Sequence, residues 1–205
     1  KTRQLVEGEG RRCVAIKGDV GDESFCRQAV DQTVKELGKL DILINNAAIA
    51  VQGKLVDDPT LDSAAFDRQW MVNVLGTVAI TRAAAQKISD GGRIVFIGSG
   101  LGTRAIVPGI ADYAGTKAAI AGYARGVQRD LGPRNITVNV VQPGIMPTDM
   151  TGEVAENFPQ AVIDMHPIRR IATIEEVAGA VSYLVSPAAS YTAGAVIDVS
   201  GGVLV

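Results

Sequence analysis

The stretch Ile94-Val95-Phe96-Ile97-Gly98-Ser99 decides the fold, because four consecutive apolar residues end at a glycine and a serine. A short apolar run of this kind is typical of a strand that is buried on both faces of a sheet. The run Ile42-Leu43-Ile44 has the same character and ends at Asn45. Sheets that are covered on both faces are built from parallel strands joined by helices, so these runs predict an α/β architecture.

Strand-like and helix-like patterns alternate along the chain. Apolar, β-branched runs predict strands, and the longer amphipathic stretches between them predict crossover helices. The predicted strands are Arg12 to Lys17, Asp41 to Asn45, Arg93 to Gly98, Thr137 to Val141 and Ala195 to Val199, and the predicted helices are Thr2 to Glu7, Glu23 to Leu37, Ser63 to Ile88, Ala111 to Leu131 and Ile174 to Leu184. We therefore expect one domain, residues 1–205, with a parallel sheet between two layers of helices.

The composition argues against several classes of protein. The chain has 20 basic and 22 acidic residues, so it has no positive excess that would follow a nucleic-acid backbone. No apolar run approaches the roughly 20 residues that span a bilayer, and the polar start Lys1-Thr2-Arg3-Gln4 does not resemble a signal peptide. Cys13 and Cys26 lack metal-ligand spacing. We expect a cytoplasmic protein with no metal and no nucleic-acid or membrane partner.

Tyr113 and Lys117 lie four residues apart in a predicted helix, which places both side chains on one face. An ammonium held beside a phenol favours the phenolate and lowers the phenol pKa from its usual value near ~10, which suits acid/base catalysis. The same spacing also occurs in ordinary amphipathic helices with one aromatic residue and one solvated lysine. Its interpretation depends on the polar residues that accompany it.

Polar residues follow the carboxyl ends of the predicted strands, where ligands bind in open parallel sheets. They are Asp19-Val20, Asn45-Asn46-Ala47-Ala48, Gly98-Ser99 and the run from Gln142 to Met150. Ser99 lies fourteen residues before Tyr113, which leaves room for a loop that returns the serine hydroxyl to the phenol. Asn73 adds a fourth polar group, so the four residues suit proton relay and carbonyl polarisation.

With these residues, the chain resembles the short-chain dehydrogenase/reductase family, and in particular its 3-oxoacyl-reductase-like members. The matching pieces are Asn45-Asn46-Ala47-Ala48, the tetrad Asn73, Ser99, Tyr113 and Lys117, the run Pro143 to Met150, and the ending from Thr192 to Gly202. The resemblance implies a Rossmann-type doubly wound sheet. It also implies an NAD(P)(H)-dependent oxidoreductase that interconverts a small-molecule carbonyl and a secondary alcohol.

The resemblance implies a role for each residue of the tetrad. Tyr113 would be the general acid or base at the substrate oxygen, and Ser99 would hydrogen-bond the same oxygen. Lys117 would hold the nicotinamide ribose and lower the tyrosine pKa. Asn73 would anchor, through its backbone, a water molecule that links Lys117 to solvent.

Cofactor contacts are also implied at several strand ends. The set is Asp19 and Val20 at the adenine, Asn46 and Ala47 along the adenosine ribose, Tyr113 and Lys117 at the nicotinamide ribose, and Pro143, Gly144, Ile145 and Thr148 around the carboxamide. Asp19 has an equal alternative as a helix cap before Glu23. The choice between NAD(H) and NADP(H) is normally made at the end of a second strand that this chain lacks, and we favour NADP(H).

The segment from about residue 146 to 172 breaks the alternation of strands and helices. Such an excursion at the carboxyl end of a strand predicts a lobe that covers the substrate. Met146 and Met150 have adaptable thioethers that suit an apolar pocket, and Leu101 is the third predicted substrate residue. Small residues on the helices Ser63 to Ile88 and Ala111 to Leu131, together with the resemblance, predict a homodimer or homotetramer.

The family's first two strands, first helix and glycine-rich turn are missing from this sequence. In the family's strand order the missing strands lie between Arg12 to Lys17 and Asp41 to Asn45, so we expect a split sheet in which Asp41 to Asn45 has an open apolar edge. We expect roughly 40 to 50 further residues upstream in the natural protein. Two alternatives to an enzyme stay open: a non-catalytic ligand-binding or regulatory protein with this fold, and an inactive fragment.

Overall fold

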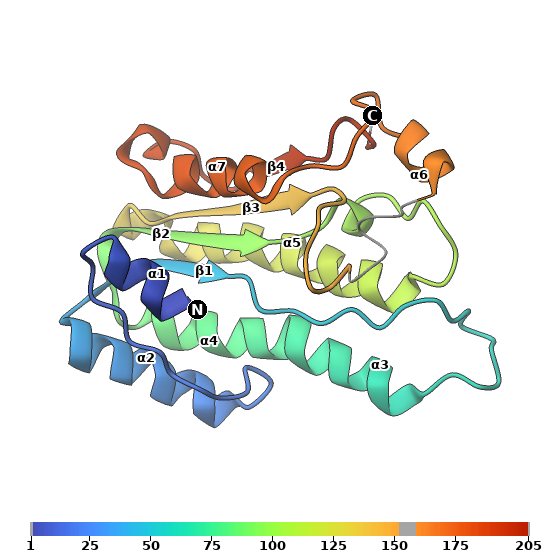
Figure 1. Cartoon of the computed structure of the whole chain (residues 1–205). Helices are drawn as coiled ribbons and strands as arrows, with labels where there is room; N and C mark the ends of the chain where they lie inside the picture. The colour runs from blue at the N-terminus through green and yellow to red at the C-terminus, as the bar shows by residue number, and fades with distance from the viewer. Residues whose placement is uncertain (1, 152–158, 205) are drawn as a thin grey trace.

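In the computed structural model, residues 2–151 and 159–204 are described. The strands β1 (Leu40–Asn45), β2 (Ile88–Ile97), β3 (Thr137–Pro143) and β4 (Val196–Val199) form one parallel sheet in the order β1-β2-β3-β4 (Figure 1). The α-helices are α1 (Thr2–Gly8), α2 (Glu23–Leu37), α3 (Ser63–Trp70), α4 (Thr77–Ala85), α5 (Ala111–Leu131), α6 (Gln160–Asp164) and α7 (Ile174–Val185). A π-helical turn, Met71–Gly76, joins α3 to α4.

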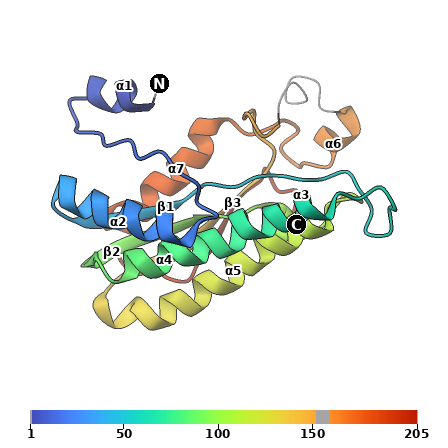
Figure 2. The same ribbon diagram turned by 90° about the horizontal axis from the view of Figure 1, so that it is seen from below.

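Helices cover both faces of the sheet and give three layers, with α2, α4 and α5 on one side and α7 on the other (Figure 2). Ile94 and Phe96 of β2 pack in one buried cluster with Ile120 of α5. Val95, which lies between them, packs instead with Val177 of α7. Successive side chains of a strand point to opposite faces, so a strand covered on both faces must be apolar throughout. The predicted doubly wound α/β fold is confirmed.

The strand predicted at Arg12 to Lys17 is wrong. This segment runs without regular structure from α1 toward Asp19, and the described sheet is continuous without it rather than split. A strand exists only where a neighbour pairs its backbone groups. The strands that would be its neighbours in the family's order are missing from the sequence, so an apolar, β-branched run alone does not produce a strand here.

The helix predicted from Ser63 to Ile88 is wrong at its C-terminal end. The helical segment ends at Ala85, and Ile88 begins β2, where it pairs with Leu40 of β1. The Ile88 side chain is 1% exposed, so an apolar residue is required there whether the backbone is helical or extended. Burial therefore did not distinguish a helix end from a strand start.

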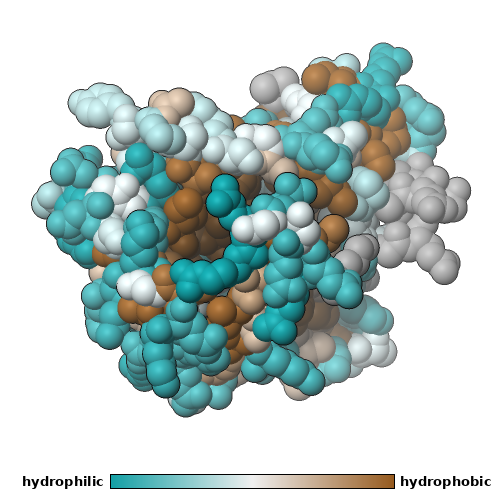
Figure 3. Space-filling model, turned by 60° about the vertical axis from the view of Figure 1, so that its left-hand side comes forward, coloured by the Kyte–Doolittle hydropathy of each residue, from teal (hydrophilic) through white to brown (hydrophobic). Residues whose placement is uncertain are grey.

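β1 lies at an edge of the described sheet, as the sequence predicts. Its Leu43 packs against the core on the α5 side, whereas Ile42 and Ile44 are 43% and 38% exposed. Figure 3 shows apolar surface gathered in a hollow between polar side chains. α1 lies apart from the layers (Figure 2) and buries none of its residues. The β1 edge and the chain segment before it, which together form the N-terminal side of the sheet, are thus the least covered part of the fold.

Within the predicted lobe, residues 146–172, the structure describes residues 146–151 and 159–172. The lobe contains the short helix α6, which the sequence did not predict. Residues 152–158 of the predicted lobe lie outside the described residues. No helix among the described residues combines the length and apolarity that a bilayer crossing requires.

Candidate active site

Tyr113 and Lys117 lie on the inner face of α5, as their spacing predicts. Their side chains are buried, at 7% and 5% exposure. The Lys117 ammonium lies 5.7 Å from the centre of the Tyr113 ring and donates a hydrogen bond of 3.0 Å to the carbonyl oxygen of Ile97 at the end of β2. The helix and the strand end together fix the ammonium beside the phenol.

Ser99 lies directly beyond β2 and meets the same phenol. It caps the short turn Gly100–Gly102, and its Oγ accepts a hydrogen bond of 3.2 Å from the backbone N–H of Leu101. Its side chain also lies close enough to the Tyr113 phenol to lower the pKa of that phenol. The predicted return of the loop from Ser99 to Tyr113 is confirmed.

Asn73 is buried in the π-helical turn between α3 and α4. Its Oδ1 accepts from the backbone N–H of Ile49, and its Nδ2 donates to the Ile49 carbonyl, both at 2.9 Å. Nδ2 also lies 3.3 Å from Oγ1 of Thr116 on α5. π-Helical turns are rare and are frequently found at functional sites. This one ties the chain after β1 to the helix that carries Tyr113.

The electrostatics of the pair differ from the prediction. Burial raises the pKa of Tyr113 above its usual value, and the hydrogen bond from Ser99 offsets only part of this effect. Burial also lowers the pKa of Lys117 from 10.5 to about 8. The predicted lowering of the phenol pKa by Lys117 is therefore wrong in this structure, because desolvation penalises both charged forms.

Asp19 and Val20 lie in the loop before α2. The Asp19 carboxylate accepts hydrogen bonds from Nη2 of Arg68 at 2.6 Å and from the backbone N–H of Gly21 at 2.8 Å. The alternative of Asp19 as a helix cap is wrong, because Asp22 caps α2. The loop packs closely against the π-helical turn, where a Cβ at Gly76 would lie 2.2 Å from the Val20 carbonyl oxygen.

The other predicted cofactor residues lie at the ends of β1 and β3. Asn46 and Ala47 are exposed beyond β1. Pro143 ends β3, and Gly144 follows so close to β4 that a Cβ there would lie 2.8 Å from Cα of Ser200. Ile145 is anchored through its carbonyl oxygen, which accepts from the N–H of Ala172 at 2.8 Å. Thr148 donates from its N–H to Oγ1 of Thr151 at 2.9 Å.

The three predicted substrate residues have different environments. Leu101 is half-buried in the turn that Ser99 caps, so it lies near the tetrad along the chain. Met146 packs against the cluster under α7, whereas Met150 is 47% exposed. The structure thus gives Met146 a packing role that the sequence did not reveal.

Sequence reasoning missed three groups that hold the tetrad in place. Thr116 bridges Asn73 and the Tyr113 carbonyl oxygen, to which its Oγ1 donates at 2.8 Å. Its spacing of three from Tyr113 placed it on the same helical face and was a usable signal. The backbone groups of Ile97 and Ile49 gave no signal, because any residue carries them.

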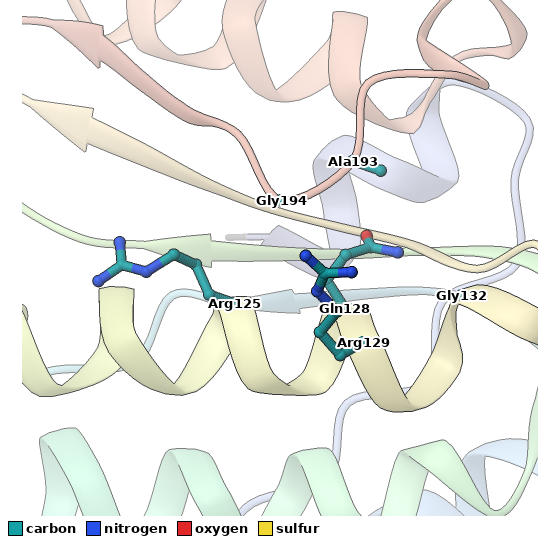
Figure 4. Close-up of a pocket in the computed structure, with 6 residues that line it drawn as sticks. All are labelled: Arg125, Gln128, Arg129, Gly132, Ala193 and Gly194. Carbon is teal, nitrogen blue, oxygen red and sulfur yellow. The ribbon is translucent and has the colours of Figure 1, made fainter.

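One hollow among the described residues lies away from the tetrad. It measures about 500 Å³ and lies between the C-terminal half of α5 and the chain before β4 (Figure 4). Its lining consists of Arg125, Gln128, Arg129, Gly132, Ala193 and Gly194. The described residues contain no group of three or more His, Cys, Asp or Glu side chains placed to hold a metal ion.

The family model described as enoyl-(acyl carrier protein) reductase matches residues 1–204. The chain belongs to the short-chain dehydrogenase/reductase family. Members of this family are NAD(P)-dependent oxidoreductases that act on carbonyl and alcohol groups, and the strand-end placement of Ser99, Tyr113 and Lys117 agrees with this membership.

Two related proteins and one solved structure match most of the chain. It is 40% identical to a cyclic-di-GMP-binding biofilm dispersal mediator protein of Escherichia coli over 87% of this chain and 74% of the relative. It is 35% identical to versicolorin reductase stcU of Emericella nidulans over 96% of this chain and 78% of the relative. A short-chain dehydrogenase from Burkholderia cenocepacia, solved in complex with NADP, superposes with a TM-score of 0.90 at 39% identity, covering 99% of this chain and 81% of that protein.

Proposed function

We propose that this short-chain dehydrogenase/reductase interconverts a small-molecule carbonyl and a secondary alcohol with NADP(H), and that Tyr113 is its general acid and base. The observation that carries the proposal is the buried contact of Tyr113 with Ser99 on one side and Lys117 on the other. The NADP bound by the Burkholderia protein supports the choice of cofactor. The similarity to versicolorin reductase supports a carbonyl substrate.

The raised pKa of Tyr113 keeps its phenol protonated at neutral pH. A protonated phenol beside the substrate oxygen would donate its proton to that oxygen during carbonyl reduction. Ser99 would donate a second hydrogen bond to the same oxygen and polarise the carbonyl. In the reverse direction the same phenol oxygen would accept the alcohol proton, and the Lys117 ammonium would stabilise the phenolate.

The residues present fit a nicotinamide cofactor at two points. The Lys117 ammonium has three N–H groups and gives one of them to the Ile97 carbonyl, so it retains donors for ribose hydroxyls. Gly144 holds the chain after β3 against β4 with no room for a Cβ, which leaves the backbone beyond it close to the proposed carboxamide position. Bound there, the cofactor would supply the hydride.

The remaining predicted residues complete the proposal. Asp19, Val20, Asn46 and Ala47 would contact the adenosine part, with Asp19 using the carboxylate that now accepts from Arg68. Residues 146–172 would cover the substrate. We also include a homo-oligomer formed through α4 and α5, since Ala118 and Gly122 of α5 are exposed and a Cβ at Gly122 would meet nothing within 4 Å.

The decisive experiment compares Tyr113→Phe with Tyr123→Phe, because both tyrosines lie on α5. Oxidation of NADPH and of NADH is followed with a panel of aldehydes, ketones and 3-oxoacyl thioesters. We expect Tyr113→Phe to abolish turnover and to leave cofactor binding intact, as measured by quenching of protein fluorescence. Tyr123→Phe removes a hydroxyl from the far part of the same helix and should retain full turnover. Turnover by Tyr113→Phe would refute the mechanism.

A second candidate is ligand binding without turnover, favoured by the similarity to the E. coli cyclic-di-GMP-binding protein. Among the described residues no carboxylate pairs with Arg125 or Arg129, and two guanidinium groups beside a hollow suit a phosphate-bearing ligand (Figure 4). Calorimetric titration with cyclic di-GMP tests this candidate. Binding that is lost in Arg125→Gln/Arg129→Gln, together with no turnover of any carbonyl, would favour it over the enzyme.

A further inference from the structure

Trp70 connects the helix before Asn73 to the start of the helix that carries Tyr113. It is the last residue of α3, directly before the π-helical turn. Its indole Nε1 donates a hydrogen bond of 2.8 Å to Oδ1 of Asp112. Asp112 precedes Tyr113, so this bond attaches the first turn of α5 to α3 next to the phenol.

The Trp70 ring also sets how closely the two helices approach. A Cβ at Gly115 would lie 3.0 Å from Cζ2 and 3.1 Å from Cη2 of Trp70. Such distances are shorter than ordinary carbon contacts, so only glycine fits there without displacing the ring. Gly115 lies between Tyr113 and Lys117 in the sequence, and the ring therefore packs on the turn that bears both residues.

A second contact from the same unit reaches α5 at the next residue. Nδ2 of Asn73 lies 3.3 Å from Oγ1 of Thr116, whose hydroxyl donates to the Tyr113 carbonyl. One contact between two helices leaves rotation about the helix axis free, whereas two contacts on different residues restrict both rotation and sliding. Trp70 and Asn73 together provide these two contacts.

The start of α5 packs against the turn Gly100–Gly102, where a Cβ at Gly102 would lie 2.8 Å from the backbone N of Ala118, but it has no side-chain cap. Its N-cap residue, Ile110, makes no side-chain capping hydrogen bond. An uncapped helix start tends to fray, and a capping side chain typically stabilises it by about 1 kcal/mol. The Trp70 contacts lie on the turn that a cap would otherwise hold.

We propose that Trp70, acting through Asp112 and Gly115, is a positioning residue that holds Tyr113 and Lys117 in catalytic register. The proposal rests on the proposed function. It predicts that the hydrogen bond of Trp70, and not the charge of Asp112, controls the catalytic step. Small displacements of a catalytic group reduce the rate strongly, because the reacting atoms must lie within a narrow range of distances.

The test uses the full chain with NADPH and its best carbonyl substrate. Trp70→Phe keeps a ring and removes the N–H donor, and Asp112→Ala removes the acceptor. We expect each substitution to lower kcat on the order of tenfold with little change in KM. Misplacement of Tyr113 and Lys117 would slow the catalytic step without weakening substrate binding. Asp112→Asn keeps an Oδ1 acceptor and should restore most of kcat. The double variant Trp70→Phe/Asp112→Ala should be no worse than either single variant.

A matched control separates positioning from general destabilisation. Phe66→Leu alters a buried residue one turn earlier on α3 and should lower the melting temperature without changing kcat. The pH profile of kcat gives a second readout. Looser packing of α5 would admit water to Lys117 and raise its pKa above about 8. The alkaline limb of the kcat profile should therefore move to higher pH in Trp70→Phe and stay at the same pH in Phe66→Leu.

Failure of this proposal is distinguishable from failure of the proposed function. If Tyr113→Phe retains turnover, the proposed function is refuted. If Tyr113→Phe is inactive but Trp70→Phe and Asp112→Ala match the unaltered protein, only the positioning role is refuted. Equal losses in Asp112→Asn and Asp112→Ala would also refute it, because they would assign the effect to charge.

Discussion

The tetrad and the N-terminal side of the sheet are held in different ways. Asn73, Ser99, Tyr113 and Lys117 are all buried, and their polar atoms meet partners from β2, α5 and the chain after β1. On the N-terminal side, Ile42 and Ile44 are partly exposed, and Asp19 is held by a surface ion pair. The half of the candidate site proposed for proton transfer is thus fixed by the core, whereas the half near the proposed adenosine position depends on exposed loops.

The difference shows that two halves of one candidate site can be held in place by different physical effects. Buried hydrogen bonds are costly to break, because an unpaired donor or acceptor loses its water as well as its partner. Exposed ion pairs contribute little, since water and salt screen them. Substitutions in the tetrad should therefore have large effects, and substitutions on the N-terminal side small ones.

Among the substitutions that compare these two regions, Lys117→Met should have the largest effect on turnover. Removing the ammonium should lower turnover roughly 100- to 10,000-fold, the range typical of acid/base groups. The same substitution should stabilise the fold by about 2 kcal/mol at pH 7, since it removes a charge whose burial is unfavourable. Steady-state rates and urea unfolding measure the two effects on one preparation.

The stability gained in Lys117→Met should decrease as the pH rises. The pKa of Lys117 is lowered from 10.5 to about 8 in the folded protein, so between these values the unfolded chain binds more protons. The burial penalty is complete below about pH 8 and disappears as the pH rises toward 10.5. The stability difference between Lys117→Met and the unaltered protein should follow this course, and a difference that grows with pH would contradict the assignment.

Asn73→Ala should have the next largest effect, on stability. It removes bonds to both backbone groups of Ile49 and to Thr116, and leaves buried partners unsatisfied. We expect the free energy of unfolding to fall by about 2 to 3 kcal/mol. Asn46→Ala, at an exposed position beyond β1, is the matched control and should leave the free energy of unfolding nearly unchanged. A similar loss in both variants would remove the contrast between the two regions.

Ile44→Lys tests the exposed edge. Because Ile44 is 38% exposed on an edge strand, a lysine there should change the free energy of unfolding by less than about 1 kcal/mol. Charges on edge strands oppose pairing with other chains, so self-association measured by light scattering should decrease. Ile94→Lys, at a buried position of β2, should prevent folding. A severe loss of stability in Ile44→Lys would show that this edge is covered.

The smallest effect is expected for Asp19→Asn. Its carboxylate accepts from Arg68, and this hydrogen bond lowers the Asp19 pKa below its usual value. A group with a lowered pKa contributes stability at neutral pH that is lost as the pH falls below 3.8 through the folded value. The melting temperature should be slightly lower than that of the unaltered protein at pH 7 and equal to it in acid. High salt should also remove the difference.

Several elements were predictable because their signals are local. The period of apolar residues located α2, α5 and α7 almost to the residue, since each helix must bury one stripe. Asp41 to Asn45 and Thr137 to Val141 were recognisable as strands because continuous apolar, β-branched runs suit a sheet covered on both faces. Ser99, Tyr113 and Lys117 were recognisable from a strand end and from helical spacing, whereas the role of Asn73 followed only from the family resemblance.

The wrong predictions of secondary structure arose where a residue distant in the sequence determines the local conformation. Arg12 to Lys17 has the composition of a strand, but no described neighbour pairs with it. Ile88 fits a helix or a strand, and its pairing with Leu40 selects the strand. Local sequence does not contain these partners.

The sequence by itself determined the fold class and the residue types of the site, because periodicity and the spacing of Tyr113 and Lys117 are properties of one segment. Only the tertiary structure decided the electrostatics. The burial that raises the pKa of Tyr113 and lowers that of Lys117 comes from residues brought together from β2, the π-helical turn and α5. Desolvation depends on all surrounding atoms, and for that reason no motif encodes it.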